Sequence, residues 1–181
     1  MNAPARLDTA RLHLRRWAEE DVDPFAALFA DDSARFIGGR CAADEAWRRM
    51  ACFVGHWALR GYGFWALEEK ASGRFVGFCG LWYPHGWPER EVGWSLVPAA
   101  RGRGFATEAA TAARAVAYGH LNWKTVVNYI APHNDPSRRV AERLGAERGS
   151  MIKLRGQDAY VYRHPRPETL GFEQTCEQME S

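Results

Sequence analysis

Residues 91–108 read Glu-Val-Gly-Trp-Ser-Leu-Val-Pro-Ala-Ala-Arg-Gly-Arg-Gly-Phe-Ala-Thr-Glu. The first seven residues are rich in strand-forming types, and Pro98 ends them because proline cannot donate to a ladder. Residues 106–121 are mostly alanine, which favours a helix. Between the two segments, Gly102 and Gly104 allow a backbone path that a Cβ would resist. The pattern predicts a strand, a tight turn and the start of a helix.

Such a turn directs consecutive N–H groups outward at a helix N-terminus, where the dipole favours an anion. Arg101 and Arg103 add positive charge, so we interpret the turn as a phosphate cradle. A P-loop would require Gly-Lys-Ser/Thr, which is absent. A Rossmann fingerprint would require Gly or Ala at position 107, where this sequence has Thr, and an acidic residue at the end of the next strand. That strand is followed instead by Ala131-Pro132. From these residues alone, an ordinary strand-to-helix turn stays open.

Length and composition indicate one globular domain. The 181 residues suffice for a hydrophobic core, and 46% hydrophobic with 25% charged residues is an ordinary soluble balance. The net charge of +2 does not indicate nucleic acid as a partner. The four cysteines lack metal-ligand spacing, so we expect reduced thiols and no metal. No apolar run could span a bilayer and no signal peptide is evident, so we expect a cytoplasmic protein without a membrane partner.

The remaining chain predicts an α/β (α+β) domain over residues 1–165 and a polar tail over 166–181. Strands are expected at residues 11–15, 62–69, 75–82, 91–97, 125–130, 147–154 and 157–163, and helices at 23–29, 44–59, 106–121 and 135–144. The strands between residues 62 and 97 are joined by short turns and therefore form an antiparallel meander. The helix from Ala106 is a crossover, so strand 125–130 should lie parallel to strand 91–97. Asp23 is the expected cap of the first helix. The core face predicted for the second helix consists of Trp47, Met50, Ala51, Val54 and Ala58.

The spacing Arg101-x-x-Gly104-x-Ala106, after a strand that ends in Val-Pro, resembles the pyrophosphate loop of the GNAT acetyltransferase superfamily. The order of elements resembles the GNAT fold over residues 7–164. This resemblance implies a mixed, mostly antiparallel seven-stranded sheet with helices on both faces and a central parallel pair. It also implies that acetyl-coenzyme A is the co-substrate and that two parallel strands splay to admit its pantetheine arm. The implied coenzyme-binding residues are Leu96, Val97, Arg101, Gly102, Arg103, Gly104, Phe105, Ala106, Thr107, Asn134 and Ser137.

The helix expected at residues 135–144 carries a second informative pattern. Asp135 is its predicted cap, and Ser137 begins an inward face that continues through Val140, Ala141 and Leu144. A hydroxyl at this place suits a ligand at the edge of the sheet. On the residues alone, a hydrogen bond from Ser137 to its own helix terminus is the better explanation.

Asn134-x-x-Ser137 also resembles the GNAT branch that includes the ribosomal-protein alanine N-terminal acetyltransferases. That resemblance implies that Asn134 contacts the pantetheine and that Ser137 lies near the coenzyme's sulfur. Many superfamily members carry a tyrosine, as the acid for the thiolate, at the position of Ala141. Its absence here leaves Ser137, directly or through a water, as the predicted acid.

Acyl transfer from a thioester to an amine requires a proton acceptor, an oxyanion stabiliser and a protonated leaving thiol. Glu91 is the predicted base, because it shares a strand face with the small Gly93 and Ser95. A surface acid paired with an arginine is an equally good interpretation of Glu91. The resemblance implies that the oxyanion donor is a backbone N–H near Leu96 or Val97, where related enzymes splay two parallel strands. Further candidate bases are His85 and Glu89, and Arg138 and Arg139 are candidates to bind the 3′-phosphate of the coenzyme. Candidate wall residues of the acceptor pocket are His133, Trp17, Phe36, Trp82 and Trp87. Each of these residues is also explicable as part of the core or of the solvated surface.

Three functional classes follow from these patterns. The first is an acetyl-coenzyme A-dependent N-acetyltransferase whose acceptor is a peptide or small-molecule amine. The second is a catalytically silent acyl-coenzyme A-binding protein, which Ala141 keeps in consideration. The third is another kind of nucleotide-binding protein, which the missing lysine and missing ribose acid disfavour. The sequence favours the enzyme, as a monomer or homodimer.

Overall fold

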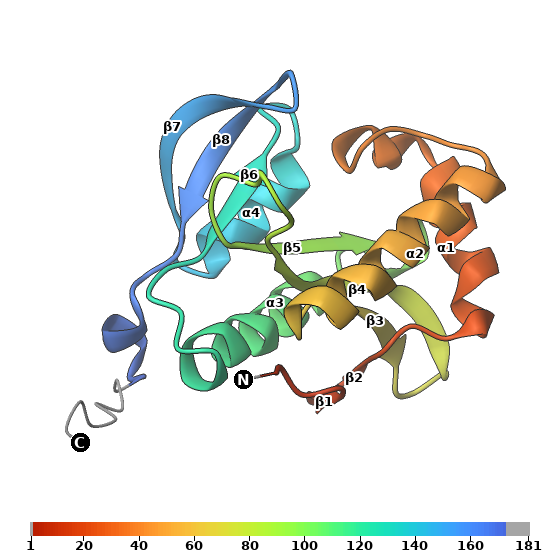
Figure 1. The fold of residues 1–181 in the computed structure, drawn as a ribbon, viewed down its shortest axis with the longest axis horizontal. Helices are drawn as coiled ribbons and strands as arrows, with labels where there is room; N and C mark the ends of the chain where they lie inside the picture. The colour runs from red at the N-terminus through yellow and green to blue at the C-terminus, as the bar shows by residue number, and fades with distance from the viewer. Residues whose placement is uncertain (1, 173–181) are drawn as a thin grey trace.

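The computed structural model describes residues 2–172, which form an eight-stranded sheet with helices on both faces (Figure 1). The strands are β1 Leu7–Asp8, β2 Leu12–Arg15, β3 Phe64–Glu69, β4 Arg74–Trp82, β5 Glu91–Leu96, β6 Val127–Ile130, β7 Glu147–Leu154 and β8 Gln157–Arg163. The α-helices are α1 Val22–Ala30, α2 Ala43–Arg60, α3 Phe105–Ala115 and α4 Asp135–Arg143. The predicted fold class is confirmed. The strand beyond the seven expected is β1, whose two residues are too few to give a sequence pattern.

The sheet order is β1-β2-β3-β4-β5-β6-β8-β7. Its pairs are antiparallel except β5 with β6, so the meander and the central parallel pair are both as expected. The chain passes from β5 to β6 through α3, the crossover that a parallel connection requires. A π-helical turn, Val116–His120, follows α3 where the sequence predicts a continuous helix.

Alternate strand residues bury themselves under different helices. Trp65 of β3 packs in the larger core with α3, whereas Phe64 packs in a second core with α1 and α2. This alternation follows from the two-residue period of a strand. A third, smaller core joins α4 to β6 and β8 through Ala141, Ile130 and Tyr162. Trp94 of β5 packs against both the largest and the smallest of these cores, so the two adjoin at this strand.

The predicted core face of α2 is wrong for most of its members. Met50 is buried, but Trp47 and Val54 are 52% and 45% exposed, and Ala51 and Ala58 are exposed as well. The buried face instead passes through Ala46, Met50, His56 and Trp57. Two hydrogen bonds fix this rotation: the Trp57 indole donates to the carbonyl oxygen of Phe64 at 2.8 Å, and Nδ1 of His56 bonds that of Tyr62 at 2.8 Å.

The predicted caps of α1 and α4 are each displaced. The N-cap of α1 is Asp21 rather than Asp23, and that of α4 is Asn134 rather than Asp135. Proline is tolerated within the first turn because the N–H groups there have no intrahelical acceptor. Pro24 and Pro136 can therefore sit one or two positions inside these helices.

Part of the predicted tail is ordered. Pro167–Leu170 is a 3-10 helix in which Pro167 is buried, and the Phe172 ring contacts Tyr118 with centroids 5.8 Å apart. Residues 173–181, including Cys176, lie outside the described residues. Cys41, Cys52 and Cys79 are free thiols. Among the helices of residues 2–172, none has the length and apolarity that crossing a membrane would require.

Candidate active site

The two parallel strands diverge at the centre of the sheet. Glu91 and Val127 form the recorded Cα pair between β5 and β6, and the Val127 N–H donates to the carbonyl oxygen of Arg90 at 3.0 Å. Beyond this pair, the side-chain amide of Asn128 donates to the carbonyl oxygen of Val92. The strands then separate, which is the splay that the family resemblance implies.

The backbone of β5 presents polar groups to the space between the separated strands. The Val97 N–H donates to the carbonyl oxygen of Val76 at 3.0 Å, on the side of β4. Bonding direction alternates along an antiparallel strand, so the N–H groups of Trp94 and Leu96 face β6. Of the two predicted oxyanion donors, Leu96 is therefore directed toward the site, whereas the Val97 N–H is already bonded.

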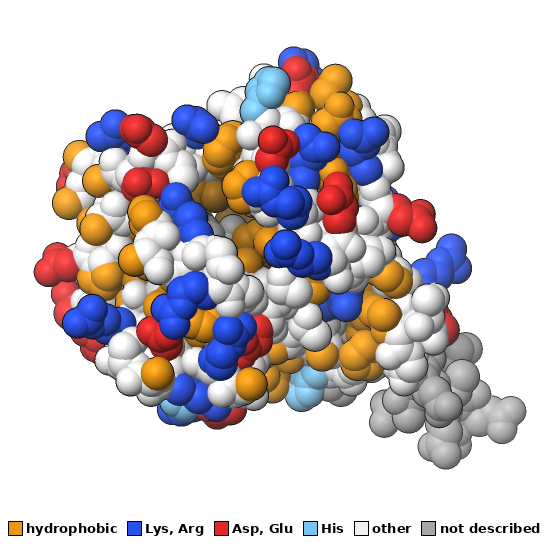
Figure 2. All heavy atoms as spheres, turned by 180° about the vertical axis from the view of Figure 1, so that it is seen from behind, with side chains coloured by type: hydrophobic (Ala, Val, Ile, Leu, Met, Phe, Trp, Pro, Cys, Tyr) orange, Lys and Arg blue, Asp and Glu red, His pale blue; other side chains and the backbone are white. Residues whose placement is uncertain are grey.

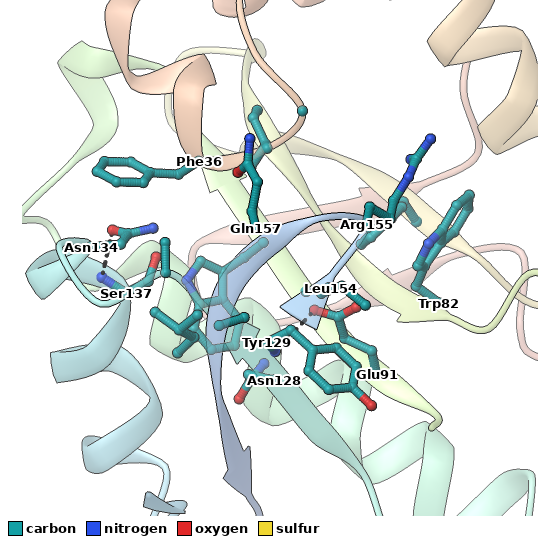
Figure 3. A pocket seen from close by; sticks show the side chains of 18 of the residues that line it. Phe36, Trp82, Glu91, Asn128, Tyr129, Asn134, Ser137, Leu154, Arg155 and Gln157 are labelled. Atoms are coloured by element: carbon teal, nitrogen blue, oxygen red, sulfur yellow. Dashed lines mark hydrogen bonds between the residues drawn. The ribbon is translucent and has the colours of Figure 1, made fainter. Parts of the chain in front are cut away.

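Glu91 lies at the point of divergence. Its Oε2 accepts from the Trp87 indole at 2.8 Å. Its Oε1 accepts from the Tyr129 N–H at 3.3 Å (Figure 3). Burial raises the pKa of Glu91 to about 8, although both hydrogen bonds oppose the shift. The carboxyl bonds no arginine among the described residues, so the surface ion-pair interpretation does not fit this environment.

Glu91 lines the larger of two cavities, which has a volume of about 610 Å³. Its walls come from α1, α2, the segment around Phe36, β3 to β6 and the β7–β8 hairpin. Of the predicted acceptor walls, Phe36, Trp82 and Trp87 line this cavity. Trp17 does not; its indole donates to the carbonyl oxygen of Phe64 within the second core.

The second cavity, of about 410 Å³, lies beside the glycine turn. Gly102 and Gly104 line it and have φ values of +75° and +82°, a region that favours glycine. The N–H groups of residues 102–107 bond to no other group in the described part of the chain. They are available to an anion at the N-terminus of α3, as the cradle interpretation requires.

Basic side chains surround the second cavity. Arg101, Arg139 and Arg143 contribute to its lining, and Figure 2 shows basic side chains beside a hollow in this face of the molecule. Arg101 is held in place: its Nε donates to the carbonyl oxygen of Leu96 at 3.1 Å and its Nη2 to the Ser33 hydroxyl at 2.6 Å. The potential around the cavity therefore favours an anionic ligand.

The two cavities meet at α4. Phe36, Ile37, Trp94, Asn134 and Ser137 line both. The Asn134 side chain accepts from the Ser137 N–H at 3.3 Å and so caps the helix (Figure 3). The Ser137 hydroxyl bonds to no described residue, so it does not satisfy its own helix terminus. It is free to act on a ligand at the junction.

Several predicted coenzyme-binding residues have side chains outside both cavities. Phe105 is fully buried in the larger core, and Arg103 forms an ion pair with Glu69. Only their backbone N–H groups remain for a ligand. Val97 packs against the two larger cores. By contrast, Leu96, Ala106 and Thr107 line the second cavity.

The further candidate bases and phosphate-binding residues also differ in whether they line a cavity. Glu89 forms an ion pair with Arg163 at 2.9 Å, and neither it nor His85 or His133 lines a cavity. Arg138 is bound by Asp135 at 2.9 Å, while its neighbour Arg139 lines the second cavity.

A buried polar chain supports the divergence of β5 and β6 and was not anticipated from the sequence. Arg114 of α3 contacts Nδ1 of His164 at 3.0 Å, and Nε2 of His164 contacts Oδ1 of Asn128 at 2.6 Å. Burial lowers the pKa of His164 to about 3, and the nearby Arg114 acts in the same direction. A neutral His164 then accepts from Arg114 and donates to Asn128. The available signal was a lone asparagine within the apolar segment 126–130.

Comparison with known proteins adds family evidence to this geometry. Residues 11–147 match the family described as "Acetyltransferase (GNAT) domain". The uncharacterized protein YkkB of Bacillus subtilis (strain 168) is 30% identical over 169 residues, covering 90% of this chain and 96% of YkkB. An acetyltransferase from Agrobacterium tumefaciens strain C58 is similar in structure, with a TM-score of 0.80 and 31% identity over 91% of this chain and 96% of that one.

A more distant structure is the aminoglycoside acetyltransferase AAC(6')-Ib in complex with coenzyme A. It has a TM-score of 0.73 and 15% identity, and the match covers 88% of this chain and 97% of that one. At this identity the similarity shows the fold alone.

Proposed function

The chain belongs to the GNAT acetyltransferase family, and on that basis we propose that it transfers an acetyl group from acetyl-coenzyme A to a primary amine. One arrangement carries the proposal: a cavity with the half-buried Glu91 carboxyl and a cavity with a glycine cradle meet at Asn134 and Ser137. An amine and a thioester that enter from opposite sides would meet there. The complex of a distant relative with coenzyme A is consistent with this use of the fold.

In the proposed reaction, the amine enters the larger cavity as an ammonium ion and gives one proton to the Glu91 carboxylate. The neutral nitrogen then attacks the thioester carbonyl, so a C–N bond forms and the C–S bond breaks. The second proton of the nitrogen reaches the leaving thiolate, so an S–H bond forms and coenzyme A leaves as the neutral thiol. Glu91 returns its proton to solvent, and the reaction releases one proton in total.

Two further groups have proposed roles at the reacting carbonyl. The Leu96 N–H faces the space between the strands and is the proposed donor to the developing oxyanion. Ser137 lines both cavities with a free hydroxyl, so it is the proposed proton donor to the thiolate, directly or through a water. Position 141 holds an alanine, which is fully buried against the third core. The sequence of α4 contains no tyrosine that could protonate the thiolate instead.

A second candidate function is that of a silent acyl-coenzyme A-binding protein. It is favoured by one observation, the alanine at position 141. The two functions differ in whether free thiol is produced, because a silent protein binds the coenzyme without transferring its acyl group.

Both candidate functions require that the protein binds the coenzyme. Thermal unfolding in excess acetyl-coenzyme A, coenzyme A or ATP tests this binding. A ligand that binds the folded state alone raises its stability by RT ln(1 + [L]/Kd). We expect a rise in Tm with both coenzymes and none with ATP. Release of free thiol from acetyl-coenzyme A on addition of amines then distinguishes the enzyme from the silent protein. No rise in Tm with either coenzyme would overturn the proposed function.

A further inference from the structure

The larger cavity has an unusually aromatic interior. Nine of its lining residues are Phe, Trp or Tyr. Three of them form a contact cluster: the Phe53 ring lies 4.8 Å from Phe64 and 5.3 Å from Trp82, and Phe64 stacks on Trp82 at 5.2 Å, centroid to centroid. Rings packed on one another make a rigid apolar surface, which suits an apolar ligand body.

The carboxyl of Glu91, which no basic residue of the described chain pairs with, lies beside this cluster. Glu91 of β5 pairs directly with Trp82 of β4, so both side chains project from the same face of the sheet. Figure 3 shows the two side chains next to each other at one end of the cavity. An ammonium group held by Glu91 would lie against ring faces, where cation–π attraction adds to the ion pair.

The other acids that line the cavity are already neutralised. Glu45 lies 3.4 Å from Arg48 and 3.5 Å from Arg49, and Asp158 lies 2.8 Å from Lys153. The lining also includes Arg49 and Arg155, which add positive charge. A ligand with a second ammonium group would have to place it against rings or arginines without a counter-ion, and burial of an unpaired charge is costly.

We propose that the acceptor is a primary amine with a single positive charge on a compact apolar body, of the arylalkylamine class. The proposal rests on the proposed acetyl transfer and specifies its acceptor. It disfavours polyamines and aminoglycosides, whose several charges exceed the single carboxyl. It also disfavours peptide N-termini, because the Phe53 and Phe64 rings near Glu91 offer no hydrogen-bond partner to the amide group that follows such an amine.

The test compares acceptors under one assay of thiol release with saturating acetyl-coenzyme A. The probes are 2-phenylethylamine, spermidine, kanamycin and a short alanyl peptide. We expect kcat/KM for 2-phenylethylamine to exceed each of the others by about tenfold or more, since desolvated cation–π contacts and the unpaired second charge each change affinity by that order. Equal or better turnover of any other probe overturns the proposal. If the coenzyme binds and no probe is acetylated, the acceptor class is likewise overturned while coenzyme binding stands.

A variant of the aromatic cluster separates binding from folding. Trp82→Leu should raise KM for 2-phenylethylamine about tenfold and leave the Kd of coenzyme A unchanged. Trp47→Leu, on the exposed side of α2, is the matched control and should change neither value. An unchanged KM in a folded Trp82→Leu protein overturns the proposed role of the cluster.

A second measurement requires neither turnover nor a substitution of Trp82. The fluorescence of Trp82, Trp87 and Trp94, which line the cavity, reports binding of 2-phenylethylamine and of its uncharged analogue 2-phenylethanol. At pH 9, where a Glu91 carboxyl with a pKa of about 8 is mostly ionised, Glu91→Gln should weaken binding of the amine about tenfold but not that of the alcohol. Equal weakening of both, or of neither, would contradict an ammonium site at Glu91. Absence of coenzyme binding in the wild type would instead remove the proposed function itself.

Discussion

The backbone N–H of Tyr129 donates to Oε1 of Glu91 at 3.3 Å. This hydrogen bond marks the end of the parallel pairing of β5 and β6. In a continued ladder the Tyr129 N–H would bind a backbone carbonyl oxygen of β5, whereas here it binds the side chain of Glu91. The same carboxyl accepts from the Trp87 indole at 2.8 Å and lines the larger cavity. The opening between the strands and the proposed base are therefore parts of one local arrangement.

Replacing Glu91 by Gln should stabilise the folded protein, and more so at high pH. The pKa of Glu91 rises from an ordinary 4.5 to about 8 on folding. Between those values the folded protein binds a proton that the unfolded chain does not, so this group lowers the free energy of unfolding as pH rises. We expect Glu91→Gln to gain about 4 kcal/mol over the wild type at pH 8 and little at pH 4.5.

Chemical denaturation of both proteins at pH 4.5, 6 and 8 measures this difference. Glu142→Gln, on the exposed side of α4, removes the same formal charge without burial and is the control. A difference between Glu91→Gln and wild type that does not change with pH would contradict the raised pKa.

The rate of acetyl transfer should depend on the ionisation of Glu91. The base must be ionised to accept a proton, so kcat/KM of the wild type should rise with pH through about 8. Glu91→Gln should be slower at pH 7 by about 10²-fold and should recover toward the wild type above pH 9, where the free amine loses its proton unaided. Thiol release measured from pH 6.5 to 10 tests this. A constant ratio of the two rates would remove Glu91 from the proposed proton path.

The Ser137 hydroxyl should contribute to the rate without contributing to the fold. Because it bonds to no described residue, Ser137→Ala should leave Tm and the Kd of coenzyme A unchanged. Loss of a proton donor should lower kcat by about 10²-fold. Ser150→Ala, an exposed serine of β7, is the matched control for the substitution itself. Full activity of Ser137→Ala would mean that a water protonates the thiolate alone.

The parts of the site that could be predicted from sequence each have a local signal. The glycine turn is bounded by Pro98 and an alanine-rich helix, and Asn134 and Ser137 stand at the start of an amphipathic helix. Glu91 begins a strand whose neighbouring residues on the same face are small. The structure brings Glu91, Asn134 and Ser137 to the lining of one cavity, and their roles there stay predictions.

The parts that could not be predicted depend on contacts between distant residues. His164 lies 36 positions from Asn128, and no local pattern connects them. The rotation of α2 is set by Trp57 bonding to the carbonyl oxygen of Phe64. Since the helix carries apolar residues around much of its circumference, periodicity alone selects the wrong stripe, with Trp47 and Val54 inward.

The neutral His164 should make the protein sensitive to acid. Folding lowers its pKa from an ordinary 6.5 to about 3, so between these values the unfolded chain binds a proton that the folded protein does not. Stability from this group is then lost as pH falls below 6.5, by roughly 2 kcal/mol at pH 5. His164→Gln should be less stable at pH 7, because buried hydrogen bonds are lost, but should lose less on acidification. Denaturation at pH 7 and 5 tests this, with the exposed His133→Gln as control. A loss on acidification as large as that of the wild type would exclude His164 as its source.

Substitution within the glycine turn should weaken coenzyme binding more than it weakens the fold. Gly104 has φ of +82° and lines the second cavity, so Gly104→Val must strain or shift the backbone whose N–H groups form the cradle. Gly73, in the β3–β4 turn, has φ of +64° and lies outside both cavities, so Gly73→Val carries a comparable strain away from the site. We expect both variants to lose about 1–2 kcal/mol of stability and only Gly104→Val to bind coenzyme A at least tenfold more weakly in calorimetry. Equal affinity of the two variants would show that residues 101–107 form a turn without a binding role.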